Sequence, residues 1–214
     1  PGCGFARTWL HNGMLLVDGE KMSKSLGNFF TLRDVLARAA PETIRLAILK
    51  SHYRGTLDIS GHALDEAARE TDRFYRALEH APAGTDADEI SPAFLDALRD
   101  DLNTPQAIAV LHTLAAQGRA GDAAAASALR ASARLLGLLT STPAAWFQGT
   151  AGHAAPGTTA PGTPDAAAIE AAIAERLAAR AARDWAGADA IRARLAAQGI
   201  LLEDKSGATT WRRA

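Results

Sequence analysis

A basic five-residue segment near the start of the chain most constrains what this chain can fold into. It reads Lys21-Met22-Ser23-Lys24-Ser25 and follows a short apolar run that ends in the turn Asp18-Gly19. Two lysines three apart on a loop flanked by Ser and Gly can place two ammonium groups against one polyphosphate. Such charges stabilise a leaving pyrophosphate in the transition state. The segment therefore predicts a phosphate-binding loop after a buried strand at 14–17, the alternative being a solvated basic loop.

The charge of the chain is unevenly distributed. Among 214 residues the formal net charge is only −1, which by itself argues against a nucleic-acid binder. Residues 1–60 nevertheless carry eight Lys or Arg against five Asp or Glu, and residues 165–214 carry eight against seven. Residues 61–164 carry seven against twelve. Both ends can therefore meet a polyanion, while the middle remains a solvated spacer.

Cysteine usage and hydropathy restrict where the protein works. The single cysteine, Cys3, excludes an internal disulfide and fits a reducing, cytoplasmic compartment. No apolar run reaches membrane-spanning length, so we expect no membrane partner. Separately, we expect the chain to be a monomer. Nucleotides are commonly bound on a parallel α/β sheet. The segment between Pro1 and the basic loop is too short to form such a sheet for ATP. We therefore expect a C-terminal part of a larger enzyme.

Apolar residues recur at steps of three and four over much of the chain, which predicts helices. The clearest helix spans residues 62–80. Others are expected to begin at the Thr31–Asp34 capping pair, at Pro41, at Pro92 and at the cap Asn103-Thr104-Pro105. The residues expected to face the core of these shorter helices are Leu32, Val35, Leu36, Ile44, Ile48, Leu49, Phe94, Leu95, Leu98, Leu102, Ile108, Leu111 and Leu114.

The composition changes at residues 143–164, which are rich in Pro, Gly, Ala and Thr and predict a linker ordered at most at its beginning. After it, Asp165 and Asp184 can cap two helices, the first with Ile169, Ile173 and Leu177 on one face. The second helix is expected to stop at Gly199. Two short strands, 200–202 and 209–212, complete a small separate module.

The sequence resembles cysteinyl-tRNA synthetases. The segment 21–25 resembles the KMSKS loop of class I aminoacyl-tRNA synthetases, and Asp96-Ala97-Leu98-Arg99 spells the DALR signature of the helical domain in that group. The resemblance covers nearly all of the chain except the linker. Its other matching strings are His11-Asn12-Gly13-Met14, Val17-Asp18, Asn28-Phe29-Phe30-Thr31, Ser51-His52-Tyr53-Arg54, Asp101-Leu102-Asn103-Thr104-Pro105, Leu202-Glu203-Asp204 and Thr210-Trp211-Arg212-Arg213.

The resemblance implies a mainly α chain in four parts. Residues 1–60 are the KMSKS loop and stem-contact segment of a class I catalytic domain, and residues 61–142 are a DALR-type helical bundle. Residues 143–164 are the linker, and residues 165–214 are a small α+β anticodon-binding module.

The resemblance also implies an activity, in which cysteine is activated by ATP to cysteinyl-adenylate and transferred to tRNA(Cys). Lys21 and Lys24 are then the catalytic residues, and the ATP-binding residues are Lys21, Met22, Ser23, Lys24 and Ser25. The His-rich ATP signature and the zinc ligands of the family are expected upstream, outside this chain. We therefore expect Cys3 to be a bystander, no metal site here, and little or no adenylation by this part alone.

The resemblance assigns six residues to the GCA anticodon of tRNA(Cys): Arg180, Trp185, Asp189, Arg192, Asp204 and Trp211. Unpaired bases are recognised by aromatic stacking and by Arg or carboxylate hydrogen bonds to their edges. The spacing places Trp185, Asp189 and Arg192 on one face of a helix, where Asp204 and Trp211 can meet them from the hairpin. Alternatively either tryptophan belongs to the core, and Asp189 with Arg192 forms a surface ion pair.

Two other functions fit part of the sequence. One is the mycothiol-pathway ligase, which shares the loop and cysteine activation but uses no tRNA, and the ending Thr210-Trp211-Arg212-Arg213 argues against it. The other is a stand-alone tRNA-binding protein, which leaves the intact phosphate loop unexplained. His52, Tyr53 and Arg54 correspond to a region where related enzymes meet the inner bend of tRNA, although a core histidine and tyrosine explain them equally well.

Overall fold

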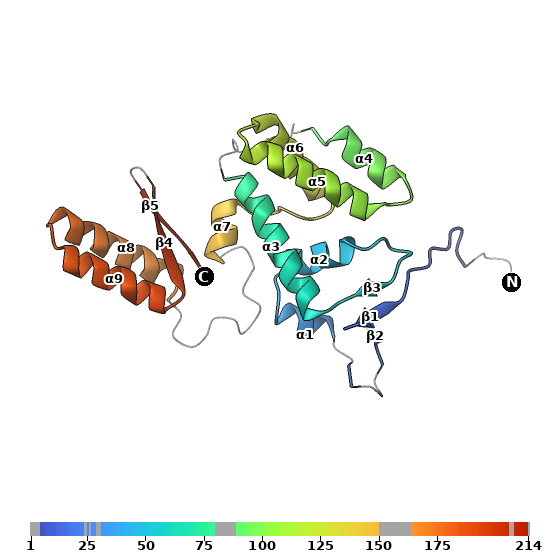
Figure 1. The fold of residues 1–214 in the computed structure, drawn as a ribbon, viewed down its shortest axis with the longest axis horizontal. Helices are drawn as coiled ribbons and strands as arrows, with labels where there is room; N and C mark the ends of the chain where they lie inside the picture. The colour runs from blue at the N-terminus through green and yellow to red at the C-terminus, as the bar shows by residue number, and fades with distance from the viewer. Residues whose placement is uncertain are drawn as a thin grey trace. The chain divides into compact units, whose positions relative to one another are not determined.

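The computed structural model describes residues 5–23, 25, 27–28, 31–79, 89–149, 164–205 and 208–213. It divides into two compact units, Pro1–Thr140 and Ser141–Ala214 (Figure 1). Helices dominate both units, with one small sheet in each, so the predicted mainly α class is confirmed. Within the described part of the chain, no helix combines the length and apolarity needed to cross a lipid bilayer.

A three-stranded sheet at the start of the first unit carries the basic loop. Its order is β2-β1-β3, with β1 at Leu15–Val17, β2 at Glu20–Lys21 and β3 at Leu57–Asp58. Strand β1 pairs antiparallel with β2 and parallel with β3. Asp18 and Gly19 join β1 to β2 with φ of 52° and 80°, the left-handed geometry of a two-residue hairpin. Asp58 Oδ2 accepts a 3.0 Å hydrogen bond from the Gly19 amide, which ties this turn to β3.

Close backbone approach fixes where the chain returns beside β1. The Gly13 amide donates to the Tyr53 carbonyl over 2.7 Å. A Cβ atom at Gly13 would collide with the Gly55 carbonyl, so only glycine fits this position. The segment that follows the second helix is therefore held against the strand that leads to the basic loop.

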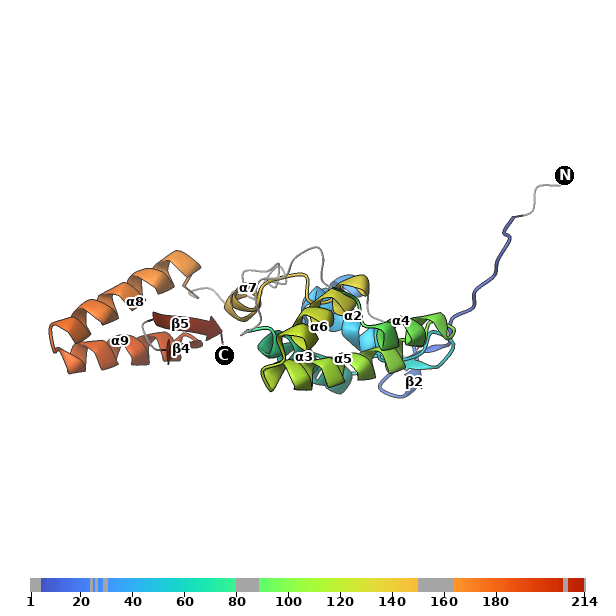
Figure 2. The ribbon, with the colours of Figure 1, turned by 90° about the horizontal axis from the view of Figure 1, so that it is seen from above.

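The described residues of the first unit also form the helices α1 to α6 (Figures 1 and 2). Helix α3 packs against α2 and α5, and α5 packs in turn against α4 and α6. The centre of this core holds Phe74, Tyr75, Phe94, Leu111 and Leu129, each at most 1% exposed. The predicted caps are present at Thr31, where Asp34 completes a capping box, and at Asn103. The helix bounds are α1 Leu32–Leu36, α2 Pro41–Leu49, α3 Gly61–Ala77, α4 Pro92–Arg99, α5 Thr104–Arg119 and α6 Ala123–Leu135.

Four of the predicted core residues are exposed. Leu102 is 53% exposed because α4 ends at Arg99 and the next turn has positive φ at Asp101 and Leu102, which breaks the helical period. Leu32, at 64%, begins a helix of only five residues. Ile48 and Leu177 lie in the last turns of their helices and are 42% and 46% exposed.

The second unit is a helical hairpin covered by a β-hairpin. Helix α7, at Pro143–Gln148, lies in the predicted linker, and α8 (Ala166–Ala181) and α9 (Trp185–Ala197) pack against each other. Strands β4 (Ile200–Lys205) and β5 (Ala208–Arg213) pair antiparallel, with β4 against α9 and β5 against α7. The predicted caps at Asp165 and Asp184 are present. The core of this unit consists of Ile169, Ala172, Ile173, Ile191, Leu195, Ile200, Leu202 and Trp211.

Arg213 contacts the chain on both sides of residues 150–163, which belong to the predicted linker. Its guanidinium donates to the carbonyl of Gln148 over 3.2 Å and to the carbonyl of Pro164 over 3.3 Å. Trp146, on α7, is 6% exposed. Helix α7 therefore belongs to the second unit, and residues 150–163, which complete the predicted linker, lie outside the described residues.

Candidate functional site

The basic loop is closed by the side chain of one asparagine. Asn28 Oδ1 accepts a 2.8 Å hydrogen bond from the Ser23 amide, and Asn28 Nδ2 donates to the Lys21 carbonyl over 3.3 Å. Lys21 itself ends β2, with an exposed side chain. Lys24 lies outside the described residues. One amide side chain thus joins the two ends of the loop that carries the predicted catalytic lysines.

The other described loop residues have conformations that suit a shaping role. The hydroxyls of Ser23 and Ser25 lie 3.1 Å apart, within hydrogen-bonding distance. Gly27 has a φ of 68°, which favours glycine, and Met22 is half-buried. Sequence reasoning found these residues but missed the role of Asn28. The available signal was that Asn side chains often hydrogen-bond nearby backbone in turns.

The side chains at positions 52–54 converge on a single carboxylate in the turn between α4 and α5. Tyr53 donates its hydroxyl to Asp101 Oδ1 over 2.7 Å, and Arg54 Nε donates to Asp101 Oδ2 over 2.8 Å. His52 Nε2 lies 2.9 Å from the Asp101 carbonyl oxygen. Hydrogen bonds from Tyr53 and then Arg54 lower the pKa of Asp101. These residues are therefore a surface latch between the two segments, and not a core histidine and tyrosine.

Three of the predicted RNA-contacting residues share an exposed face of α9. Trp185 is 60% exposed at the first position of the helix, and Asp189 and Arg192 follow at steps of four and three with exposed side chains. Among the described residues no ion pair joins Asp189 to Arg192. An indole, a carboxylate and a guanidinium are thus presented together to solvent.

Asp204 and Arg180 are held together on the hairpin side of α8. Arg176 Nη1 and Nη2 donate to Asp204 Oδ1 and Oδ2 over 2.9 and 2.8 Å, and Thr209 donates its hydroxyl to Oδ1 over 2.7 Å. Arg180 Nη1 lies 3.7 Å from Oδ2. The hydrogen bonds from Arg176 and Thr209 hold the pKa of Asp204 far below its usual range. Sequence reasoning missed Arg176, whose four-residue spacing from Arg180 was the available signal.

Trp211 occupies a different environment from Trp185. Its side chain is 4% exposed and packs in the core of the second unit. Its indole N–H donates to Glu170 Oε1 over 2.7 Å. The alternative that one tryptophan belongs to the core therefore holds for Trp211, while Trp185 is free to meet a ligand.

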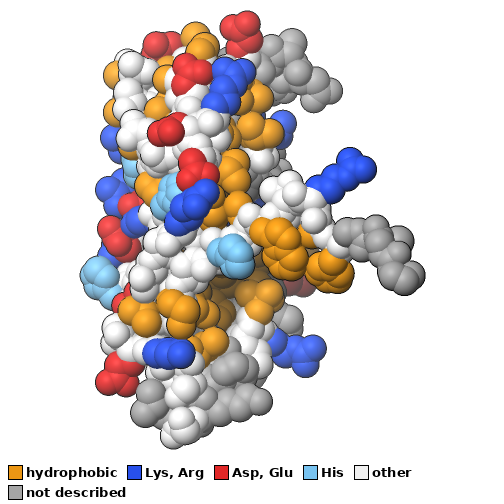
Figure 3. All heavy atoms as spheres, turned by 90° about the vertical axis from the view of Figure 1, so that its right-hand side faces the viewer, with side chains coloured by type: hydrophobic (Ala, Val, Ile, Leu, Met, Phe, Trp, Pro, Cys, Tyr) orange, Lys and Arg blue, Asp and Glu red, His pale blue; other side chains and the backbone are white. Residues whose placement is uncertain are grey.

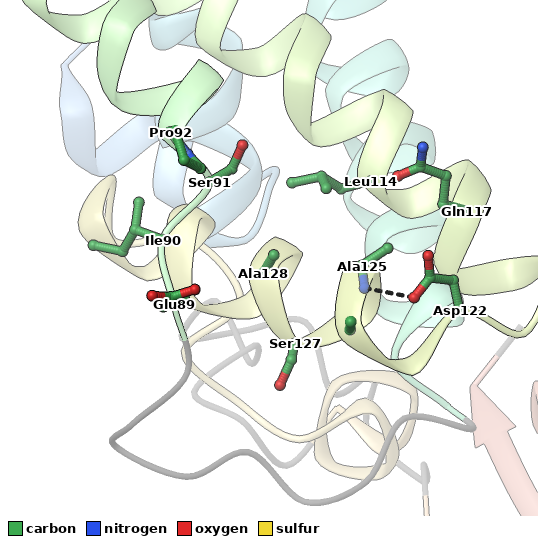
Figure 4. Close-up of a pocket in the computed structure, with 11 residues that line it drawn as sticks. Glu89, Ile90, Ser91, Pro92, Leu114, Gln117, Asp122, Ala125, Ser127 and Ala128 are labelled. Atoms are coloured by element: carbon green, nitrogen blue, oxygen red, sulfur yellow. Dashed lines mark hydrogen bonds between the residues drawn. The ribbon is translucent and has the colours of Figure 1, made fainter.

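A cavity lies between the start of α4, the end of α5 and the start of α6, and none of the predicted site residues lines it (Figure 4). Leu114, Gln117, Asp122 and Ser127 are among its lining residues. The Asp122 carboxylate already accepts the Ala125 amide as the cap of α6. We assign no ligand to this cavity because its charged lining residues, Glu89 and Asp122, are both acidic, and Asp122 already serves as a helix cap.

Aromatic side chains also gather near the N-terminal segment. Phe5 and Trp9 are 92% and 65% exposed, and their ring centroids lie 5.9 Å apart. Figure 3 shows hydrophobic side chains clustered on the face that carries this segment. An exposed apolar patch is typical of a contact surface. In the described ranges no group of three or more His, Cys, Asp and Glu side chains is placed to hold a metal, and Cys3 lies outside them.

Three family models match successive parts of the chain. Residues 2–69 match the model for the tRNA synthetases class I (C) catalytic domain, and residues 93–140 match the DALR domain. Residues 162–212 match the cysteinyl-tRNA ligase anticodon binding domain. The loop and residues 52–54 lie in the first match, Asp101 lies in the second, and the exposed face of α9 lies in the third.

Curated relatives match over the whole chain. A protein named cysteine–tRNA ligase from Acidiphilium cryptum (strain JF-5) is 57% identical over 100% of this chain and 45% of its own length. Proteins of the same name from Gluconobacter oxydans (strain 621H) and Paramagnetospirillum magneticum (strain ATCC 700264 / AMB-1) are 57% and 51% identical, over 100% and 99% of this chain. The chain spans 44% and 46% of those two relatives, so less than half the length of each of the three.

Proposed function

Because the chain belongs to the cysteinyl-tRNA ligase family, we propose that it supplies the KMSKS-type loop and the tRNA-binding part of an ATP-dependent cysteine–tRNA ligase. In this reaction the carboxylate of cysteine attacks the α-phosphate of ATP and pyrophosphate leaves. The cysteinyl group then passes to the terminal ribose of tRNA(Cys). The ammonium groups of Lys21 and Lys24 stabilise the charge on the leaving pyrophosphate.

The role of the loop scaffold follows from the same chemistry. A transition-state charge is stabilised best by groups that are already in place. Asn28 closes the loop through the Ser23 amide and the Lys21 carbonyl, which supports its role in holding the lysines ready for the phosphates. Met22, Ser23 and Ser25 complete the ATP-binding segment and carry no proton chemistry.

The exposed face of α9 is the observation that carries the RNA-binding half of this proposal. Trp185 offers a surface on which an unpaired base stacks, and Asp189 and Arg192 offer an acceptor and donors for base edges. Arg180 and Asp204 are a second such pair, and Trp211 supports the hairpin from inside. We assign these residues to the GCA anticodon of tRNA(Cys). The protein is expected to act as a monomer in the cytoplasm, where a single unpaired cysteine is stable.

Substituting Trp185 tests the anticodon assignment. We expect Trp185→Ala to weaken binding of the chain to tRNA(Cys) by roughly 5- to 100-fold, because stacking on one aromatic side chain contributes about 1–3 kcal/mol per base. Binding is measured by fluorescence anisotropy at one fixed salt concentration. Trp9→Ala is the matched control, since Trp9 is equally exposed but lies in the other unit. Equal loss in both variants, or equal binding of an anticodon-changed tRNA by the unsubstituted chain, contradicts the assignment.

Pyrophosphate exchange tests whether this chain by itself can form cysteinyl-adenylate. We expect the chain with cysteine and ATP to exchange labelled pyrophosphate no faster than a blank, because the catalytic-domain model matches only residues 2–69 and the relatives are more than twice as long. Lys21→Ala is the matched control for a contaminating ligase. Exchange that the unsubstituted chain shows and Lys21→Ala lacks would prove that the chain activates cysteine by itself.

The match to an anticodon-binding model favours this function over the mycothiol-pathway ligase, since a ligase that uses no tRNA has no need for such a module. The loop closed by Asn28 favours it over a stand-alone tRNA-binding protein. The aromatic side chains of Phe5 and Trp9 are exposed, which is typical of a surface that contacts another part of a protein or a protein partner.

A further inference from the structure

We infer that Arg176 is a positioning residue for RNA recognition, which fixes the Asp204 carboxylate so that one acceptor position on Oδ2 faces an unpaired base beside Arg180. The inference rests on the proposed function of this unit. Arg176 was not among the residues that resemblance assigns to the anticodon. Its side chain is 5% exposed, whereas the side chains of Asp204 and Arg180 are 40% and 43% exposed. It therefore acts from beneath the surface that a base can reach.

The hydrogen bonds of Asp204 leave it little freedom. A carboxylate offers about four acceptor positions, two on each oxygen. Oδ1 accepts from Arg176 and from Thr209 and is saturated. Oδ2 accepts from Arg176 over 2.8 Å, and the next donor, Arg180 Nη1, lies 3.7 Å away, beyond hydrogen-bonding distance. One position on Oδ2 thus stays open within the described part of this unit, on the side of Arg180.

The bidentate pair with Arg176 sets the orientation of the Asp204 carboxylate. Two parallel bonds from a planar guanidinium fix both the distance and the plane of the carboxylate, which a single ammonium cannot do. The register of the hairpin places Thr209 opposite Asp204. Oδ1 is therefore held by Thr209 on β5 and by Arg176 on α8, and Oδ2 is held by Arg176. Arg176 and Arg180 stand one helical turn apart on α8, so one arginine orients the carboxylate while the other remains near it at the surface.

The ligand that fits this pair is a nucleobase edge with an N–H donor beside an acceptor. The donor meets Asp204 Oδ2, and the acceptor meets Arg180. Bases differ in the order of donors and acceptors along their Watson–Crick edges, so a fixed carboxylate discriminates among them and a rotating one does not. Arg176 is therefore expected to govern selectivity more than affinity.

A double-mutant cycle between Arg176→Lys and Asp204→Asn tests the inference on the whole chain. The readout is the ratio of affinities for an RNA stem-loop that carries the GCA anticodon and for stem-loops with one of these bases changed. We expect Arg176→Lys to lower this ratio by roughly tenfold, since a lysine ammonium cannot hold both carboxylate oxygens in one plane as the bidentate guanidinium does. In the Asp204→Asn background the same substitution should have no further effect on the ratio. Arg194→Lys is the matched control, because Arg194 makes a single 3.3 Å bond to Glu175 at the surface of the same unit.

The outcomes separate the inference from the function on which it rests. An unsubstituted chain that binds all stem-loops equally overturns the proposed function. An unsubstituted chain that discriminates, together with an Arg176→Lys chain that discriminates equally well, overturns only the role of Arg176, as do losses that add in the cycle. If circular dichroism shows that Arg176→Lys does not fold, Thr209→Val takes its place, because it removes one of the two bonds to Oδ1. Additive losses or no loss in that cycle overturn the inference as well.

Discussion

Replacing Trp211 with alanine is expected to destabilise the second unit strongly, although resemblance assigns this residue to the anticodon. Its side chain is 4% exposed and its indole N–H donates to Glu170, so the substitution leaves a large cavity and removes this hydrogen bond. A buried Trp→Ala change costs about 3–5 kcal/mol. A unit of this size has a total stability of about 4–11 kcal/mol. Hydrogen exchange of residues 166–213, followed by mass spectrometry, is the measurement, and protection in α8 and β5 should fall strongly.

Trp185→Ala provides the matched control within the same unit. Trp185 is 60% exposed, so its removal should leave hydrogen exchange nearly unchanged while it weakens RNA binding. Trp211→Phe, which keeps most of the apolar volume, should restore much of the protection. If Trp211→Ala kept full protection and lost only RNA affinity, Trp211 would contact the base directly, and its burial in the free protein would have to be relieved on binding.

The two tryptophans show which part of the site could be predicted from sequence. Helical spacing placed Trp185, Asp189 and Arg192 on one face, because the direction of side chains on a helix depends only on local geometry. Spacing could not tell which tryptophan faces the core, since that depends on how the β-hairpin lies on α8 and α9. The contact of Arg176 with Asp204 likewise could not be predicted, because the two residues lie 28 positions apart along the chain.

In the fold, too, contacts between residues near in sequence were predictable, and contacts between distant segments were not. Caps at Thr31, Asn103, Asp165 and Asp184 were predictable because each is a contact between residues three apart in sequence. The burial of Leu102 was wrongly predicted, since Asp101 and Leu102 have positive φ in the turn that contacts residues 52–54, and this turn interrupts the helical period. Buried polar contacts between distant segments leave no periodic signal.

Glu42 is the clearest of these hidden contacts, and its replacement is expected to have the second large effect. It is 9% exposed in the first turn of α2. Its carboxylate accepts the Tyr75 hydroxyl over 2.9 Å, the Leu139 amide over 3.0 Å, the Thr140 amide over 3.1 Å, and the Thr140 hydroxyl. One side chain thus joins α2, α3 and the turn that ends the first unit. Sequence alone suggests only an acidic residue in a favourable position near a helix N-terminus.

We expect Glu42→Ala to destabilise the first unit by about 3–5 kcal/mol. The substitution leaves the Leu139 amide buried without this acceptor and removes the carboxylate that accepts from Tyr75 and Thr140, and a buried donor that loses its acceptor costs about 1–3 kcal/mol. Urea unfolding followed by circular dichroism is the measurement, with hydrogen exchange of residues 61–77 to locate the change. Glu66→Ala is the control: its carboxylate is 45% exposed and its partner Lys50 keeps Glu70, so its loss should cost at most about 1 kcal/mol.

Glu42→Gln separates the charge from the acceptor geometry. The amide oxygen can still accept, but the amide nitrogen cannot accept from the donors that face the second carboxylate oxygen. We therefore expect a loss between those of Glu42→Ala and Glu66→Ala. Were Glu42→Ala as mild as Glu66→Ala, the turn at Leu139 and Thr140 would be held by the Arg45–Gly137 hydrogen bond instead, and the carboxylate would be dispensable. If the losses follow the expected order, the turn that ends the first unit depends on this one buried acid.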